Sequence, residues 1–487
     1  METNLGQQSD DSYKYESIKR NISDAIDSGV LSAGERIPSL RSMSRKSQVS
    51  INTIMRAYLE LEMEGRIESR PQSGFYVRRK ARGIPLPGVS DPDLQPTRPH
   101  SFNFHFEFLN AMADPGIVPL GAATPSPELL PVAELRKLLR QAGAAHDNAY
   151  GYEELPGNGK LRAQIAFHML AAGISAHMDD VIITNGGSEA LYMALSTLAG
   201  PGATVAVESP CYFGYLHILK TLGISVLEIP TAPETGVDID ALEQAFDRYD
   251  VKACILQPNF NNPFGCLTPD DKKRRLAELF AGRAVPLIED DTVGDLPFQG
   301  ERPRSIASFN SATDVTYISS FSKTLSPGFR IGWIHGKNHR EALLRSKMAI
   351  SMNTNRPVQL ALANYLAGGR YAKHLQKYIV QCRKQVEQVS TAVARFFPET
   401  TRLTNPEGGF LLWAVLPEEI DTDILYNMAM AEGIGITPGS IFTSQNRYRN
   451  CIRLSCAHPY SERIESALKR LGELAEKIKE KGEVDQG

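Results

Sequence analysis

The chain has 487 residues, of which 42% are hydrophobic and 22% charged, and its formal net charge is −3. This length exceeds what one hydrophobic core usually supports, so we expect two or three domains of a globular protein. The charge excludes a global attraction to nucleic acid or membranes, and no run of about 18 apolar residues is present to span a bilayer. Six scattered cysteines without metal-ligand spacing predict reduced thiols in a cytoplasmic protein and no metal site.

Residues 12–79 are predicted to form a winged helix-turn-helix domain. Apolar side chains three to four residues apart indicate its first helix: Tyr15, Ile18, Ile22 and Ile26. A short second helix opens at Ser39, and the run from Ser50 to Thr53 offers a capping start for a longer third helix. Residues 66–70 and 74–78 are predicted as paired strands around a turn at 71–73, which completes the wing.

A basic surface accompanies these elements. Residues 36–80 contain ten Lys or Arg against four Glu, which predicts salt-dependent contact with DNA phosphates. The stretches 34–41, 57–65 and 73–77 closely resemble the DNA-binding domain of the GntR family. In that family an arginine often follows the residue that opens the recognition helix, and Ile51 stands there in this chain. The DNA-binding residues that we expect, from the resemblance and from side chains that compensate for the missing arginine, are Arg41, Arg45, Ser50, Asn52, Thr53, Arg56 and Gly74.

Residues 80–118 are predicted to be a linker, because frequent prolines remove backbone donors and bias their predecessors away from helix. From residue 119 onward, strands punctuated by glycine alternate with helices, which predicts an α/β domain.

The stretch from Ser320 to Arg330 places Lys323 among hydroxyl groups and an arginine. A lysine amine can form a Schiff base with an aldehyde cofactor, while serines and an arginine nearby can hold the phosphate of the same molecule. A second anion site is predicted where the strand 181–184 turns through two glycines into a helix, since free backbone N–H groups and the helix dipole point at a ligand there. The apolar run 285–291 predicts a buried strand that delivers carboxylates at its carboxyl end, where open α/β sheets bind ligands.

The order and spacing of these motifs resemble fold-type I, aspartate-aminotransferase-like enzymes over residues 119–475, with a large part at about 119–355 and a small α+β part at about 356–475. The resemblance implies pyridoxal 5′-phosphate as cofactor. It implies that Lys323 forms the internal aldimine, Asp290 pairs with the pyridine nitrogen, Asn262 bonds the ring hydroxyl and Tyr212 stacks on the ring. The groups that it implies around the phosphate are Ser188, the backbone N–H of Glu189, Ser320, Ser322 and Arg330.

The same resemblance bears on four further residues. Tyr152 matches a tyrosine that reaches the phosphate of the neighbouring subunit, and Arg453 matches the arginine that grips a substrate α-carboxylate. Relatives usually carry a tyrosine two or three residues after the pyridine-binding aspartate, where this chain has Thr292 and Val293. We therefore expect cofactor binding to survive and turnover to be slow.

Both halves in this order resemble the MocR subfamily of GntR regulators. The resemblance implies a head-to-tail homodimer that binds double-stranded DNA at an operator near a target promoter. It also implies that the protein senses pyridoxal phosphate, or its adduct with an amino acid or amine, through an aldimine on Lys323. Two alternatives remain open. In the first, the chain is an active aminotransferase that converts amino acid to keto acid and carries a fused DNA-binding domain. In the second, the N-terminal domain does not bind DNA and serves only to dimerise or to bind a protein.

Overall fold

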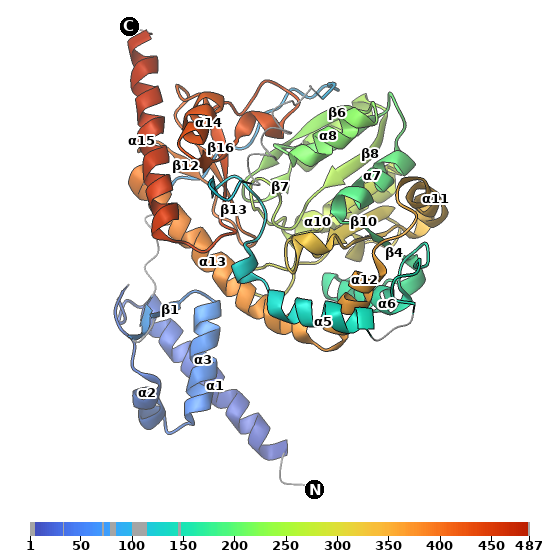
Figure 1. The fold of residues 1–487 in the computed structure, drawn as a ribbon. Coiled ribbons are helices and arrows are strands. Elements are labelled where there is room, and N and C mark those ends of the chain that lie inside the picture. The colour runs from blue at the N-terminus through green and yellow to red at the C-terminus, as the bar shows by residue number, and fades with distance from the viewer. Residues whose placement is uncertain are drawn as a thin grey trace. The chain divides into compact units, whose positions relative to one another are not determined.

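The computed structural model describes residues 5–32, 34–70, 73–77, 84–99, 114–144 and 148–485. The chain divides into two compact units, Met1–Gly83 and Ile84–Gly487 (Figure 1). Residues 71–72 of the predicted wing turn, the basic residues 78–80 and the linker residues 81–83 and 100–113 lie outside the described residues. No helix in the described ranges is long and apolar enough to cross a membrane.

The first unit is a winged helix-turn-helix, as the sequence predicts. Its elements are α1 (Leu5–Asp27), α2 (Leu40–Ser47), α3 (Ile51–Met63), β1 (Ile67–Arg70) and β2 (Gly74–Val77). The hydroxyl groups of Ser39 and Ser50 cap α2 and α3, and β1 pairs antiparallel with β2. The Tyr58 hydroxyl donates to the Pro38 carbonyl at 2.7 Å, which fixes α3 against the start of α2. The apolar faces of the three helices meet in one small core.

The second unit is built on an eight-stranded mixed sheet with the order β4-β11-β10-β9-β8-β5-β6-β7. Strands β10, β9, β8, β5 and β6 run parallel, whereas β11 and β7 are antiparallel to their neighbours. The strands are β4 (Val181–Thr184), β5 (Thr204–Ser209), β6 (Ser225–Ala232), β7 (Gly236–Val237), β8 (Val251–Leu256), β9 (Leu287–Asp290), β10 (Val315–Ser320) and β11 (Gly332–His335).

Helices cover both faces of this sheet, because successive apolar residues of each strand point to opposite sides. Ile182 and Ile288 pack with α7, α8 and α11, whereas Ile183 and Leu287 face the helices on the other side. The helices of this part are α5 (Val132–Ala144), α6 (Gly159–Met169), α7 (Gly187–Leu198), α8 (Phe213–Thr221), α9 (Ile239–Arg248), α10 (Asp270–Arg283), α11 (Arg340–Ile350) and α12 (Arg356–Ala367).

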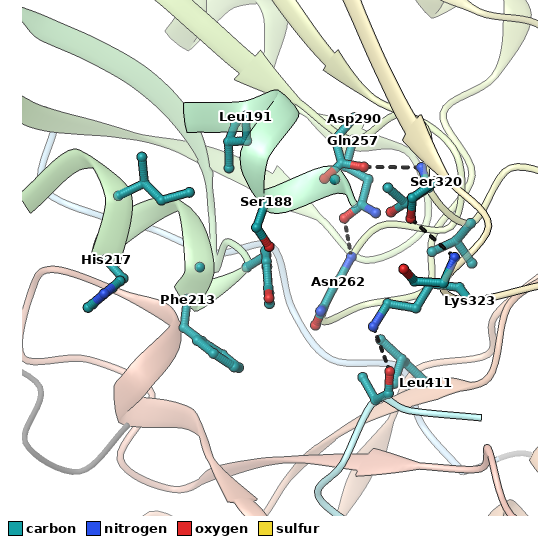
Figure 2. Close-up of a pocket in the computed structure, with 18 of the residues that line it drawn as sticks. Ser188, Leu191, Phe213, His217, Gln257, Asn262, Asp290, Ser320, Lys323 and Leu411 are labelled. Carbon is teal, nitrogen blue, oxygen red and sulfur yellow. Dashed lines mark hydrogen bonds between the residues drawn. The ribbon is translucent and has the colours of Figure 1, made fainter. Parts of the chain in front are cut away.

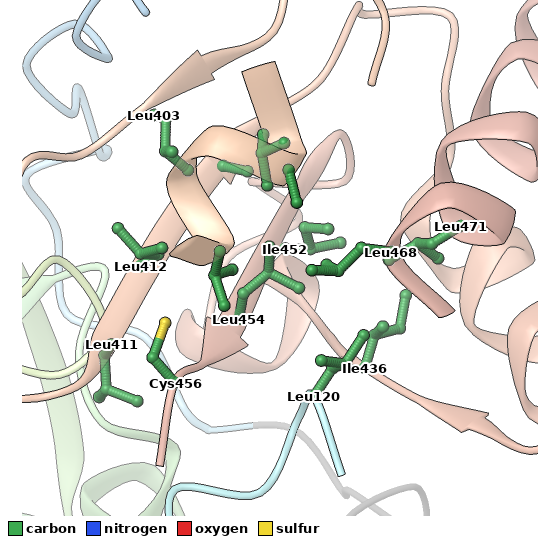
Figure 3. Close-up of a cluster of buried hydrophobic side chains, with 14 of the residues drawn as sticks. Leu120, Leu403, Leu411, Leu412, Ile436, Ile452, Leu454, Cys456, Leu468 and Leu471 are labelled. Atoms are coloured by element: carbon green, nitrogen blue, oxygen red, sulfur yellow. The ribbon is translucent and has the colours of Figure 1, made fainter. Parts of the chain in front are cut away.

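A smaller subdomain follows, and the long helix α13 (Arg370–Phe396) leads into it. Its antiparallel sheet has the order β12-β13-β16-β15. Leucines and isoleucines of β13 and β16 pack against α15 in the core shown in Figure 3. The remaining elements are β12 (Arg402–Leu403), β13 (Leu411–Val415), α14 (Thr422–Ala431), β14 (Ile434–Gly435), β15 (Thr437–Pro438), β16 (Cys451–Ser455) and α15 (Glu462–Asp485).

The predicted linker packs on the second unit wherever the structure describes it. The Pro85 carbonyl accepts from Leu403 N–H, and Thr97 exchanges two backbone hydrogen bonds with Val226 at an edge of the fold. Strand β3 (Val118–Pro119) pairs in parallel with β14. Proline prevents regular structure in this stretch but leaves carbonyl groups free to accept from neighbouring strands.

Candidate cofactor-binding site

A cavity of about 450 Å³ opens at the carboxyl ends of the central strands (Figure 2). Asp290 and Ser320 enter it from the ends of β9 and β10, while Leu411 of β13 closes it from the small subdomain. Eight of the ten predicted cofactor residues line the cavity: Ser188, Tyr212, Asn262, Asp290, Ser320, Ser322, Lys323 and Arg330. The topology of parallel strands therefore gathers residues that lie up to about 140 positions apart in the sequence.

Asp290 is held at the end of β9 by two donors. The Tyr215 hydroxyl donates to Oδ2 at 2.8 Å, and the Thr292 N–H donates to Oδ1 at 3.1 Å. Burial raises the pKa of Asp290, whereas these hydrogen bonds to its charged form oppose that rise. The arrangement suits a carboxylate that pairs with a protonated ring nitrogen.

Lys323 follows β10, and its amine donates to the Ala123 carbonyl at 2.7 Å. Burial lowers the pKa of Lys323 to about 8, and the charges of Arg453 and Arg330 act in the same direction. The neutral form of this amine is therefore more populated near physiological pH than that of an ordinary lysine. The neutral form is the nucleophile that an aldehyde requires.

The turn between β4 and α7 forms the positive end of the cavity. Gly186 has a φ of +86°, and no side chain caps α7 there, so the first N–H groups of the helix remain available to an anion. The Arg330 guanidinium lies directly over Gly186, where any Cβ would collide with it. Arg330 donates to the Ser322 hydroxyl at 3.4 Å and to the Asn185 carbonyl at 3.1 Å.

Glu189 lies in the first turn of α7, next to this anion site. Its carboxylate accepts from the N–H of Asn185 in its own turn and does not line the cavity. The prediction that Glu189 contributes only its backbone N–H to a phosphate site stays a prediction.

Arg453 lies behind the cavity on β16, only 1% exposed. Its guanidinium donates to Asn262 Oδ1 at 3.0 Å, to the Gly121 carbonyl and to the Thr437 hydroxyl, while its Nε has no partner. Burial lowers the pKa of Arg453 to about 10, so it still carries its charge at neutral pH. A buried guanidinium whose described hydrogen bonds include no carboxylate fits an incoming carboxylate.

Tyr212 presents its ring to the cavity at the start of α8. The ring stands against Gly214, where a Cβ would collide with it, and makes an edge contact with Tyr215 at 5.4 Å between centroids. Tyr152 behaves differently, since it is 85% exposed and lies outside the cavity.

Sequence reasoning missed three groups that support the site. Tyr215 lies three residues after Tyr212, but no local signal pairs it with Asp290, which is 75 positions away. The Gln257 amide oxygen accepts from Asn262 N–H at 2.8 Å, which holds that loop. Arg302 donates to Asp291 at 2.8 Å and to Asp295 at 2.5 Å beneath the end of β9. No sequence motif around Arg302 predicts these two hydrogen bonds.

The predicted DNA-binding residues of the first unit differ in their exposure and in their contacts. The exposed ones are Arg41, Arg45, Ser50, Asn52 and Arg56. Ser50 and the buried Thr53 bond to each other at the start of α3, with 2.8 Å between their hydroxyl oxygens. Arg56 and Gly74 also contact neighbours within the unit: the Arg56 guanidinium lies 3.9 Å from the Tyr15 ring centroid, and Gly74 lies beneath the Arg36 side chain.

The cavity fits pyridoxal phosphate on its own chemistry. It combines an uncapped helix N-terminus and an arginine for a phosphate, a carboxylate for a ring nitrogen, an aromatic face and a lysine whose pKa is low. Among the described residues no cluster of ligating side chains suits a metal ion.

Comparisons with known proteins cover both units. The family of bacterial regulatory proteins, gntR family, matches residues 14–77, and the aminotransferase class I and II family matches residues 116–471. The Escherichia coli HTH-type transcriptional regulator YjiR is 36% identical over 94% of this chain and 98% of its own length. The Staphylococcus aureus HTH-type transcriptional regulator NorG is 27% identical over 91% of this chain and all of its own length.

Solved aminotransferases share the fold of the second unit. Thermus thermophilus LysN, an alpha-aminoadipate aminotransferase complexed with N-(5′-phosphopyridoxyl)-L-leucine, matches 78% of this chain and 96% of its own with a TM-score of 0.72 and 27% identity. Pyrococcus horikoshii kynurenine aminotransferase matches 78% of this chain and 95% of its own with a TM-score of 0.72 and 28% identity. The chain therefore belongs to the transcriptional regulators that join a GntR-type DNA-binding domain to a pyridoxal-phosphate-binding, aminotransferase class I and II domain, the architecture of the MocR subfamily.

Proposed function

We propose that this regulator binds an operator near a target promoter and changes its DNA affinity when an amino acid or amine reaches the cofactor at Lys323. The observation that carries the proposal is the cavity in which Lys323, Asp290 and Asn262 lie together, in a chain that also holds a winged helix-turn-helix. An amine changes DNA binding only if it has different affinities for two arrangements of the protein. The proposed domains span residues 12–79 and 119–475.

Each side chain has a proposed part in holding the cofactor. Pyridoxal phosphate supplies an aldehyde that combines with primary amines and a ring that withdraws electrons. Asp290 keeps the ring nitrogen protonated, Asn262 bonds the ring hydroxyl, and Tyr212 covers one ring face. The proposed phosphate ligands are Ser188, Glu189 through its N–H, Ser320, Ser322 and Arg330. Arg453 binds the carboxylate of an amino acid.

A head-to-tail homodimer is the proposed assembly. Tyr152 lies outside the cavity of its own chain and is almost fully exposed, which supports a role in the phosphate site of a partner subunit. All six cysteines are free and buried, which supports a cytoplasmic location.

Fluorescence anisotropy of the full chain on the DNA upstream of its own gene tests this function, with scrambled competitor at moderate salt. We expect selective binding that changes when pyridoxal phosphate, and then a panel of amino acids and amines, is added. Lys323→Ala should abolish the response, whereas Lys337→Ala, an exposed lysine outside the cavity, should preserve it. Binding without sequence preference, or a response that survives in Lys323→Ala, contradicts the proposal.

A working aminotransferase is the second candidate, and the buried Arg453 beside Asn262 favours it. The apolar Val293, which lines the cavity where relatives usually have a tyrosine, speaks against rapid turnover. Net formation of keto acid at roughly one per second or faster would establish the enzyme. We expect slower conversion, and Val293→Tyr should raise its rate.

A further inference from the structure

Helix α3 carries an exposed apolar residue at its first position. Ile51 is 46% exposed, whereas the apolar residues Ile54, Ala57, Tyr58 and Leu61 of the same helix are completely buried. The core of the first unit therefore does not account for an isoleucine here. In a helix-turn-helix, the N-terminal residues of the recognition helix, which is α3 in this chain, contact base edges in the major groove.

The residues next to Ile51 in sequence either make contacts within the domain or are polar. The Ser50 hydroxyl accepts from Thr53 N–H at 3.1 Å and bonds the Thr53 hydroxyl, so both groups serve the helix cap. Thr53 is only 8% exposed. Arg56, in the second turn, contacts the Tyr15 ring and the Glu60 carboxylate. Ile51 and Asn52 are thus the side chains of the first turn that remain exposed.

The chemistry of the major groove selects a partner for an apolar side chain. Thymine carries a C5-methyl group there, and apolar side chains recognise it, whereas an arginine recognises guanine through O6 and N7. The exposed Arg41 and Arg45 of α2 supply charge for the phosphates on which such docking depends.

We propose that Ile51 contacts a thymine methyl group, so that each operator half-site carries a thymine where an arginine at this position would select guanine. The inference rests on the proposed function and specifies the DNA that the regulator reads. Ile51 is a specificity residue in this assignment, and the basic residues around it supply most of the affinity.

The test begins with selection of binding sites from a random double-stranded DNA library by the full chain with pyridoxal phosphate. Each thymine of the enriched site is then replaced by deoxyuracil, which removes only the methyl group, and affinity is measured by anisotropy. We expect one thymine in each half-site at which the replacement weakens binding roughly fourfold, the factor for burying one methyl group. Ile51→Ala should bind the thymine and uracil sites equally, and Ile51→Arg should enrich guanine at that position.

Leu59→Ala is the matched control. Leu59 is 48% exposed on the same helix but lies about 12 Å further along its axis, beyond the turns that face the bases. This variant should keep the full uracil effect, and unchanged thermal unfolding of all three variants checks their folding.

The possible outcomes distinguish failure of the thymine contact from failure of the proposed function. Enrichment of a sequence with no uracil effect, or an effect that persists in Ile51→Ala, overturns the thymine contact alone. Ile51→Ala that leaves sequence selection unchanged but dissociates the dimer shows a protein contact instead and also overturns it. A wild-type chain that enriches no sequence overturns both proposals.

Discussion

At the scale of single residues, the amine of Lys323 shares its surroundings with two guanidinium groups. Burial, together with the charges of Arg453 and Arg330, lowers the pKa of Lys323 to about 8 against the opposing charge of Asp290. A lysine whose pKa is lowered gains neutral amine as pH rises through about 8, instead of through its ordinary value near 10.4. We therefore expect the rate at which pyridoxal phosphate attaches, followed by visible absorbance, to rise with pH to a midpoint near 8.

Arg453→Met should move that midpoint upward, because Arg453 is the arginine whose charge lowers the pKa of Lys323 more. Arg345→Met is the control, since Arg345 is an exposed α11 residue that pairs with Glu341 outside the cavity. An unchanged midpoint in Arg453→Met would show that Lys323 does not sense this arginine.

The residues that were predicted from the sequence stand in recognisable motifs, whereas the residues that were missed do not. Lys323 and Asp290 stand in local motifs whose order along the chain is informative, and the structure brings both into one cavity. The Tyr215 hydroxyl that holds Asp290 comes from a helix 75 positions earlier, so only the packing of α8 on the sheet creates the contact. Arg302 lies only 7 and 11 positions after Asp295 and Asp291, and the fold of the loop that follows β9 brings the three side chains together.

At the scale of elements, the turn between β4 and α7 needs a glycine for its backbone conformation and places an arginine where an anion can bind. Gly186→Ala would force a Cβ into a residue with φ of +86° and push it against the Arg330 guanidinium. We expect weaker binding of pyridoxal phosphate, by about tenfold or more, because strain of this kind costs roughly 1–3 kcal/mol and displaces Arg330, a proposed phosphate ligand.

Binding of pyridoxal, which lacks the phosphate, separates the two effects. Gly186→Ala should leave pyridoxal affinity nearly unchanged if the turn serves the phosphate, and Gly200→Ala, in open space after the same helix, should alter neither ligand. Equal losses for both ligands would mean that the substitution disturbs the whole cavity instead.

Helices, strands and caps were predictable where their signals are local. The Ser50 cap, the paired wing strands and the buried strand that ends at Asp290 all appear as expected. The course of residues 84–99 was not predictable, because proline content identifies irregular backbone without saying which surface it follows. Thr97 forms its two backbone hydrogen bonds with Val226, a residue 129 positions later in the chain.

At the scale of the whole molecule, the proposed head-to-tail dimer makes a site that no single chain completes. Tyr152 is exposed on its own chain, whereas Lys323 faces the cavity. If Tyr152 serves the partner, a mixed dimer of Lys323→Ala and Tyr152→Phe chains contains one intact site, built from the lysine of one chain and the tyrosine of the other. If Tyr152 serves its own chain, the same mixed dimer contains none.

Random exchange of equal amounts of the two variants should therefore restore tight cofactor binding at about a quarter of all sites, since half of the dimers are mixed and each has one intact site. Titration with pyridoxal phosphate measures that fraction, and each variant alone provides the baseline. Restoration requires both that the chains exchange and that Tyr152 crosses the interface, so dimer exchange is verified first with differently tagged chains. Exchange without restored sites would place Tyr152 outside the phosphate site of the partner and remove the main support for a shared site.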